Sequence, residues 1–304
     1  MIRDIVFSEE AKEFLANELK RDKNSGTYLV YGSDMGLLFE YALSFAKGLC
    51  CTELENDFCD KCSVCKRVDN LSYSDLEIFE NPNGLTVDEI RTLGYKSSNT
   101  SYEGTKKVFI IKDISKMKKE AANALLKVIE EPNENTYFIL LNKNLNMLPT
   151  IKSRAMLIKI KKRTASQLGV DNFTYEFFKG SNQDIYEFKK GDFNLEEGYS
   201  YLDIRDAIKR YSETNDISAK IDVFKGIRDF VKNRNYIPEI DKIYFAEEIV
   251  KGTSDRNIFN EIVAYTTDLL GDIEGLEKRL EQKNMLRAPI NMKLFFINFF
   301  INIW

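Results

Sequence analysis

The chain of 304 residues contains no histidine. This absence excludes Ser-His-Asp and Cys-His nucleophilic catalysis, the HExxH metalloproteases and every metal site with a histidine ligand. Proline and glycine are scarce, with 5 and 15 residues, which indicates long helices joined by few turns.

Long apolar runs are also missing, because the longest, 294–304, is too short for a membrane span of about 20 residues. The charged start, 1–6, lacks the apolar core of a signal peptide, so we expect neither a signal peptide nor a membrane segment.

Neither sign of charge dominates, because 44 Lys and Arg residues oppose 48 Asp and Glu residues, for a net charge of −4. This balance argues against a nucleic-acid binder that works by bulk positive charge, although it leaves a local basic patch open. The chain is 43% hydrophobic, which is enough to build cores, and its length is typical of two or three domains of about 100–150 residues. All five cysteines lie between positions 50 and 65, whereas a secreted disulfide framework would spread along the chain. We therefore expect a cytoplasmic protein.

The first 162 residues alternate strand and helix patterns. Several strand-like runs are almost wholly apolar and rich in β-branched and aromatic residues, as is typical of parallel strands covered on both faces. The predicted strands are 27–31, 76–79, 108–111, 136–141 and 156–160. Helices are predicted to begin after Ser8 and Thr86, to cover 37–49, and to run from 115 to 131, where Pro132 stops the pattern. This alternation predicts a doubly wound α/β domain.

The β-strand signal fades after Arg163, and helical patterns follow to the end of the chain. We therefore expect three parts, which are an α/β domain over 1–162, a small helical module over 163–195 and a helical domain over 196–304. The last segment, 289–304, is apolar around most of a helix, so it must be buried. Burial in the core of its own domain and burial against another subunit are both open from the sequence.

Four of the cysteines have the spacing Cys50-x8-Cys59-x2-Cys62-x2-Cys65. Thiolates bind Zn²⁺ tetrahedrally, and a site with four protein ligands leaves no open position for catalysis, so the pattern predicts a structural zinc module over about 50–65. The segment between the first two cysteines has too little apolar content to fold alone, and a metal would stabilise it. Cys51 is interpreted as a bystander. Redox thiols or unpaired surface cysteines are the other interpretations of this cluster.

The first predicted strand runs into Gly32-Ser33-Asp34-Met35-Gly36-Leu37-Leu38-Phe39, where the P-loop pattern G-x-x-x-x-G-K-S/T would lie. In that register Leu37 replaces the second glycine, Leu38 the lysine and Phe39 the hydroxyl residue. The cation that neutralises the β- and γ-phosphates and a ligand of Mg²⁺ are therefore missing. Lys112, after the third predicted strand, stands where an acidic pair would hold the cation. Both losses predict a site without nucleotide hydrolysis. In the alternative, Gly32 is a simple strand-to-helix turn in an unrelated Rossmann-like domain.

Three segments in a fixed order resemble clamp-loader subunits of bacterial DNA polymerase III. They are the four-cysteine module, the helix 123–132 that ends in Glu-Glu-Pro, and the segment 148–154, which reads Leu-Pro-Thr-Ile-Lys-Ser-Arg. The gamma/tau and delta-prime subunits share this order, but gamma/tau subunits carry an intact P-loop and delta-prime subunits often do not. The chain therefore resembles the delta-prime type, most strongly over 27–162. Ala155 departs from the family, in which a cysteine usually follows the Ser-Arg pair.

The resemblance implies a fold, a function and a set of partners. The fold would be an AAA+ (RecA-like) parallel-sheet domain with an inserted zinc module, a small helical lid and an all-α C-terminal collar domain. The chain would be a non-hydrolysing delta-prime-type subunit that binds no ATP and assembles with gamma/tau and delta subunits to load the sliding clamp on primed DNA. Arg154, with Ser153 of the same motif, would be an arginine finger that acts in trans on the ATP site of a neighbouring subunit.

Several alternatives stay open beside this interpretation. Arg154 can instead pair with a carboxylate of its own domain. The whole chain can be an active gamma/tau-type ATPase subunit or a free-standing zinc-binding adaptor. Two lysine-rich clusters, 116–119 and 159–163, are either solvated faces or contacts to DNA phosphates.

Overall fold

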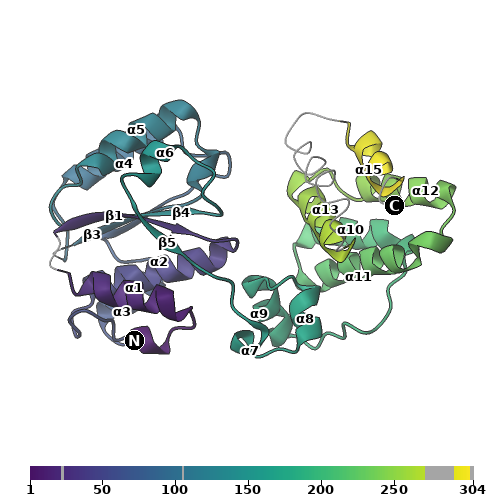
Figure 1. Ribbon diagram of the computed structural model, residues 1–304, viewed down its shortest axis with the longest axis horizontal. Helices are drawn as coiled ribbons and strands as arrows, with labels where there is room; N and C mark the ends of the chain where they lie inside the picture. Colours follow the sequence, from purple (N-terminus) through teal and green to yellow (C-terminus); the bar gives the residue numbers. More distant parts are fainter. Residues whose placement is uncertain (22–23, 105, 271–290, 302–304) are drawn as a thin grey trace. The chain divides into compact units, whose positions relative to one another are not determined.

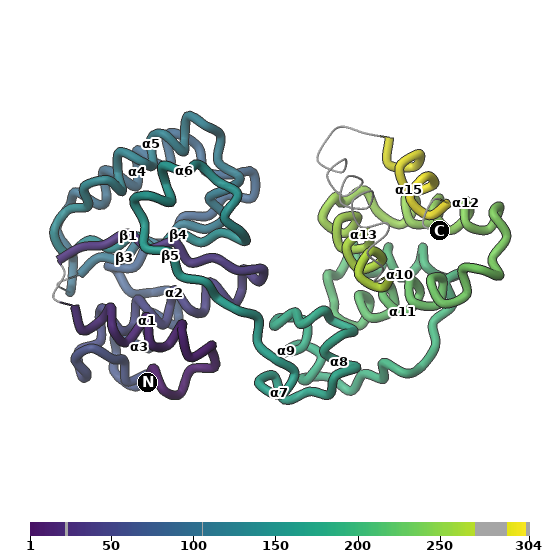
Figure 2. The backbone as a smooth tube through the Cα atoms, viewed as in Figure 1, coloured from purple at the N-terminus to yellow at the C-terminus, as the bar shows by residue number. Residues whose placement is uncertain are grey.

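The computed structural model describes residues 1–21, 24–104, 106–270 and 291–301. Its chain forms two compact units, Met1–Gly169 and Val170–Trp304, whose ribbon and backbone trace are drawn in Figures 1 and 2.

A five-stranded parallel sheet forms the centre of the first unit, with the strand order β2-β3-β4-β1-β5. The strands are β1 (Ser25–Tyr31), β2 (Leu76–Phe79), β3 (Lys107–Ile111), β4 (Thr136–Asn142) and β5 (Met156–Lys159). Every residue of β3 and β4 is buried, which explains why these runs are apolar without alternation. All five strands expected from the sequence are therefore confirmed, with ends that differ by at most two residues.

Helices cover both faces of this sheet (Figure 1). Alternate residues of a strand point to opposite faces, so Val30 packs among α1, α2 and α3, whereas its neighbour Leu29 packs on the side of α4, α5 and α6. The helices of this unit are α1 (Glu9–Leu19), α2 (Met35–Cys50), α3 (Ser63–Asp69), α4 (Val87–Ser98), α5 (Lys119–Glu130), α6 (Pro149–Lys152) and α7 (Ala165–Leu168), with 3-10 turns at Ile2–Asp4 and Ile114–Lys116. The doubly wound α/β architecture is confirmed.

Local capping sets the starts of these helices. The Ser8 side chain accepts from the amide of Ala11, and Thr86 forms the expected capping box with Glu89. Helix α5 begins at Lys119, four residues later than predicted, because a 3-10 turn precedes it after Asp113, whose φ of 54° is left-handed.

The second unit is wholly helical over its described residues. Its helices are α8 (Asn172–Phe177), α9 (Asn182–Lys190), α10 (Ile204–Thr214), α11 (Ile217–Asn233), α12 (Glu239–Gly252), α13 (Arg256–Leu270) and α15 (Met292–Ile301), with 3-10 turns at Tyr201–Asp203 and Arg234–Tyr236. The small helices α8 and α9 pack on the longer ones: the Phe177 ring lies 6.1 Å from that of Phe224, and the Lys220 ammonium bonds Asp184 at 2.9 Å and Glu261 at 3.3 Å.

The apolar C-terminal helix α15 lies against α12 in the core of its own unit. The Phe300 ring contacts the rings of Phe230 and Phe245, with centroids 5.4 and 5.0 Å away, and Phe296 is fully buried. Of the two burial modes open from the sequence, packing in its own core is therefore present over 291–301. The rest of the predicted segment 289–304 falls outside the described residues. Across the described ranges, every helix is too short or too polar to cross a bilayer.

The packing of Gly252, at the end of α12, yields a test of this helical core. A Cβ atom there would lie 2.8 Å from two carbons of Ile208 and 3.1 Å from the carbonyl oxygen of Arg205, which are too close to accommodate it. We expect Gly252→Ala to destabilise the second unit by about 1–3 kcal/mol, although alanine is usually the better helix former. Urea unfolding would measure the loss. Gly198→Ala is the control, because nothing lies within 4 Å of that Cβ, and equal stability of both variants would contradict the packing.

Candidate functional site

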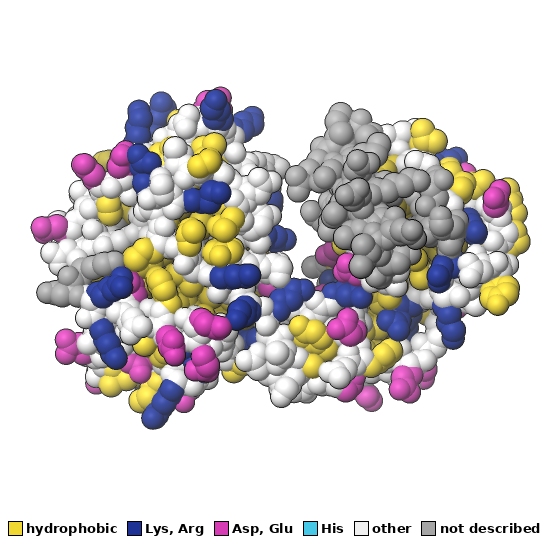
Figure 3. Space-filling model, in the orientation of Figure 1, with side chains coloured by type: hydrophobic (Ala, Val, Ile, Leu, Met, Phe, Trp, Pro, Cys, Tyr) yellow, Lys and Arg dark blue, Asp and Glu magenta, His cyan; other side chains and the backbone are white. Residues whose placement is uncertain are grey.

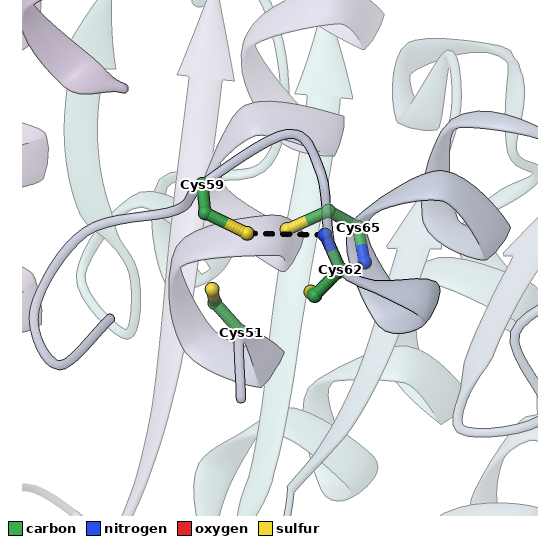
Figure 4. Close-up of side chains that lie close together, drawn as sticks. All are labelled: Cys51, Cys59, Cys62 and Cys65. Carbon is green, nitrogen blue, oxygen red and sulfur yellow. Dashed lines mark hydrogen bonds between the residues drawn. The ribbon is translucent and has the colours of Figure 1, made fainter. Parts of the chain in front are cut away.

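Four cysteine sulfurs converge at one end of α2. The Sγ atoms of Cys51, Cys59, Cys62 and Cys65 all lie within 4.8 Å of one another (Figure 4). Cys51 is the C-cap of α2, Cys59 belongs to the following loop, and Cys62 caps the N-terminus of α3, which contains Cys65. Helix ends and a short loop thus bring together four thiols that are spread over fifteen positions of the chain.

The structure corrects the predicted ligand set, which named Cys50 and left Cys51 out. Cys50 is the last residue of α2, and its sulfur lies against the carbonyl oxygen of Lys106, 4.0 Å away, where burial raises its pKa to about 12. Cys51 leaves the helix with φ −58° and ψ 132°, so the chain turns and directs the next sulfur into the cluster. The spacing of the cysteines does not reveal which of two adjacent residues ends the helix.

Backbone amides surround the cluster and favour negative charge on its sulfurs. The amide of Cys62 donates to Cys59 Sγ at 3.2 Å, and the amide of Cys65 donates to Cys62 Sγ at 3.3 Å (Figure 4). Burial opposes ionisation of Cys62, but the amides of Cys65 and Thr52 outweigh it and lower the pKa of Cys62 to about 6. Burial and a hydrogen bond to Cys62 raise the pKa of Cys65. The pKa shifts of these two thiols run in opposite directions, and negative charge is favoured on Cys62.

This donor set fits a four-coordinate metal ion. Zn–S bonds of about 2.3 Å place tetrahedral sulfurs about 3.8 Å apart, a small contraction from the observed group. The loop is already anchored, because the Lys47 ammonium bonds Asp60 and Asp69 and lies 4.8 Å from the centre of the buried Phe58 ring. The amide of Ile2 also donates to Asp57, at 2.9 Å. Four soft sulfur ligands on a preformed loop can hold one Zn²⁺ without an open coordination position.

The loop between β1 and α2 packs closely against the end of β5. A side chain at Gly32 would collide with the carbonyl oxygen of Ile160, so only glycine fits this turn. Leu37 and Leu38, in the first turn of α2, are 2% and 0% exposed and belong to the core beneath the sheet. The two positions where a P-loop would place its second glycine and its lysine therefore hold buried apolar side chains.

Charged groups of the chain itself surround this loop. The Asp34 carboxylate caps α2 and accepts from the amide of Leu37 at 3.1 Å, at a helix terminus that otherwise favours anionic ligands. The Lys112 ammonium lies 4.0 Å from the centre of the Phe39 ring and 2.8 Å from Glu80 Oε2. Lys112 follows β3, as expected, and the structure brings it to Phe39. The role of Asp34 as the cap did not emerge from the sequence, although aspartate just before an apolar helix is a common cap signal.

Arg154 follows the short helix α6 and is engaged by its own unit. Its Nη2 atom lies 2.6 Å from Glu130 Oε1, and its Nη1 atom donates to the carbonyl oxygen of Thr150 at 3.2 Å. The side chain is 32% exposed. Ser153 donates its hydroxyl to the same Thr150 carbonyl at 3.0 Å, and the buried Ile151 fixes α6 to the core. The internal carboxylate partner that the sequence left open is therefore present, and it is Glu130 of the Glu-Glu-Pro motif.

The two lysine-rich clusters differ in how far the chain neutralises them. In 159–163, Lys161 pairs with Glu10 at 2.7 Å and Arg163 pairs with Glu40. In 116–119, Lys116 pairs with Asp113 at 2.7 Å, and the cluster is exposed at the start of α5. Figure 3 shows Lys and Arg side chains over α5 and α6 of the first unit. Contact between either cluster and DNA stays a prediction.

Comparisons with known proteins concentrate on the first unit. A family model described as "DNA polymerase III, delta subunit" matches residues 7–164. The chain is 34% identical to DNA polymerase III subunit delta' of Bacillus subtilis over 149 residues, which are 48% of this chain and 45% of that protein. It is also 34% identical to subunit tau of the same organism over 167 residues, 54% of this chain and 30% of tau. The chain thus spans about half or less of these relatives' lengths.

A solved structure shares the fold over nearly the whole chain. The crystal structure of a DNA polymerase III, gamma subunit-related protein from Thermotoga maritima covers 95% of this chain and 97% of its own, with a TM-score of 0.59. The sequence identity is 17%, so this likeness concerns the fold alone. With the five-stranded parallel sheet and the helical second unit, it confirms the expected AAA+ fold class.

The cysteine geometry predicts different metal contents for two neighbouring variants. Because Cys51 belongs to the cluster and Cys50 does not, Cys51→Ser should lower bound zinc well below one ion per chain, while Cys50→Ser should keep about one. Elemental analysis of both purified variants, after dialysis without chelator, measures the zinc. Loss of zinc from Cys50→Ser with retention by Cys51→Ser would restore the ligand set predicted from spacing.

Proposed function

The chain belongs to the DNA polymerase III delta subunit family, and on this basis we propose that it acts in the clamp loader as a non-hydrolysing subunit of the delta-prime type. Its family membership agrees with the resemblance noted in the sequence. Relatives named delta' and tau match it with equal identity, so identity does not choose between the two types. The choice rests on the loop between β1 and α2.

The buried first turn of α2 is the observation that carries this proposal. A working P-loop needs a lysine for the β- and γ-phosphates and a hydroxyl for Mg²⁺, but Leu38 is in the core and Phe39 lies under the Lys112 ammonium. The Asp34 carboxylate repels phosphate from the one helix terminus that would attract it. The helix terminus that would attract phosphate thus has the Asp34 carboxylate, and Lys112 stands where an acidic pair would hold Mg²⁺. Both charges favour a subunit that does not turn over ATP.

Arg154 supports a role in a neighbouring active site. A planar guanidinium that is always charged stabilises the charge that develops on a γ-phosphoryl group, and it can do so from another subunit. Arg154 is partly exposed at the end of α6, which the buried Ile151 anchors. Its contacts to Glu130 and Thr150 use one N–H of each terminal nitrogen, so its other N–H donors are left for an anion of a neighbouring subunit. We assign Arg154, with Ser153 of the same motif, as the arginine finger supplied in trans.

The remaining parts follow from this role. Gamma/tau and delta subunits would be the partners in the assembly, and the complex would load the sliding clamp on primed DNA in the cytoplasm. Zinc at the four-cysteine cluster would be structural, because four sulfurs complete its coordination. The segments 163–195 and 196–304 would be the lid and the collar domain of the AAA+ arrangement.

The alternative, a gamma/tau-type ATPase, is tested by nucleotide binding to the isolated chain. We expect no saturable binding of Mg-ATP at concentrations up to about 1 mM, because the phosphate loop lacks its cation and its Mg²⁺ ligand. Equilibrium dialysis with labelled ATP measures the binding, with a gamma/tau subunit of the same organism as positive control. Micromolar affinity together with hydrolysis would establish the ATPase alternative instead.

The trans role of Arg154 is tested in the assembled complex. Arg154→Ala should reduce turnover at the neighbouring ATP site by about a thousandfold or more, so the total ATPase rate falls by at least the share of that site. Lys152→Ala is a matched control, because it removes a positive charge from the same short helix. Assembly is followed by gel filtration and ATPase by phosphate release in the presence of clamp and primed DNA. An unchanged rate in a complete Arg154→Ala complex would contradict the trans role. If the wild-type chain itself does not assemble with the ATPase subunits, the free-standing adaptor is favoured instead.

A further inference from the structure

The guanidinium of Arg154 is fixed by two acceptors that come from different elements. Glu130 Oε1, at the end of α5, holds Nη2 at 2.6 Å, and the Thr150 carbonyl oxygen, in α6, holds Nη1 at 3.2 Å. Contacts to both terminal nitrogens define the plane of the guanidinium group. They leave its other N–H donors available for a further anion. The side chain is thereby oriented before any partner arrives.

Glu130 occupies an electrostatically unfavourable place in its own helix. It is the last residue of α5, where the dipole carries partial negative charge, and Glu131 follows it at the C-cap. Glu130 is also half exposed, at 53%, so burial does not account for it. The contact to Arg154 Nη2 is the ion pair that offsets this placement, and α5 and α6 both pack in the core above the sheet through Ile129 and Ile151.

We propose that Glu130 is a positioning residue, which orients the Arg154 guanidinium toward the ATP site of the neighbouring subunit. This inference rests on the proposed trans role of Arg154. A free arginine side chain samples many rotamers, and ordering it at the moment of reaction lowers the rate. Because Glu130 and Thr150 hold the guanidinium from two helices that pack in the core, part of that ordering is already present in the isolated subunit. Glu130 does not touch the nucleotide in this arrangement, so its effect passes entirely through Arg154.

The role of Glu130 predicts a defined pattern of ATPase rates in the assembled complex. The measured quantity is the Arg154-dependent rate, which is the ATPase rate of a complex minus the rate of the same complex carrying Arg154→Ala as well. Glu130→Ala should lower this rate about three- to tenfold, mainly in kcat, with little change in the KM for ATP. Glu130→Gln should restore most of it, because the amide oxygen still accepts from Nη2. Glu131→Ala, which removes the adjacent charge at the same helix end, should leave it unchanged.

A double variant separates positioning from a structural effect. If Glu130 acts through Arg154, adding Glu130→Ala to Arg154→Ala causes no further loss, whereas a structural defect adds to it. Thermal unfolding and gel filtration of each complex show that the variants fold and assemble. A wild-type or higher rate in Glu130→Ala, a loss not rescued by glutamine, or a further loss in the double variant would each overturn the positioning role. An Arg154→Ala complex with the wild-type rate would instead overturn the trans role on which it rests.

Discussion

The packing of the first turn of α2 into the core is the constraint on which the chemistry of the first unit depends. Leu37 and Leu38 are buried beneath the sheet, and Gly32 lies against the Ile160 carbonyl with no room for a side chain. Each buried leucine contributes about 1.5–3 kcal/mol by leaving water, so the turn is stable without a ligand. A P-loop is arranged in the opposite way, because it keeps its backbone amides and its lysine open to phosphate. In this chain, buried apolar side chains fill the first turn of α2, at the positions where a P-loop would place its second glycine and its lysine.

Helix α2 connects this turn to the cysteine cluster. It begins at Met35, directly after the Asp34 cap, and ends at Cys50, with Cys51 as its C-cap and cluster member. Near its end, the Lys47 ammonium bonds Asp60, in the loop between Cys59 and Cys62, and Asp69, the last residue of α3. The helix therefore orders the cluster from one side, and a metal would order the loop from the other. In our proposal zinc adds stability to this fold, because an ion that binds only the folded chain stabilises it.

The sequence predicted the fold well because its patterns are local. Continuous apolar runs mark all five strands, and the capping box at Thr86 and the stop at Pro132 mark helix ends. The cysteine cluster of the structure differs by one residue from the predicted ligand set, because the choice between Cys50 and Cys51 depends on the last backbone angles of α2, which spacing does not encode. The pairing of Arg154 with Glu130 joins residues 24 positions apart, so it could be named only as an unspecified carboxylate.

The loop between β1 and α2 and the Arg154 site differ in how much each contributes to the packing of its own unit. Leu38, at the position where a P-loop would have its lysine, supplies core packing to its own unit and no cation. Arg154 acts, in our proposal, on a neighbour, and its packing contributes little to its own unit because the side chain is partly exposed and its ion pair lies at the surface. Stability alone therefore gives no reason to keep an arginine here, or a glutamate at the unfavourable end of α5. Both residues are explained together if the guanidinium must stay charged, accessible and oriented for a phosphate that this chain does not itself bind.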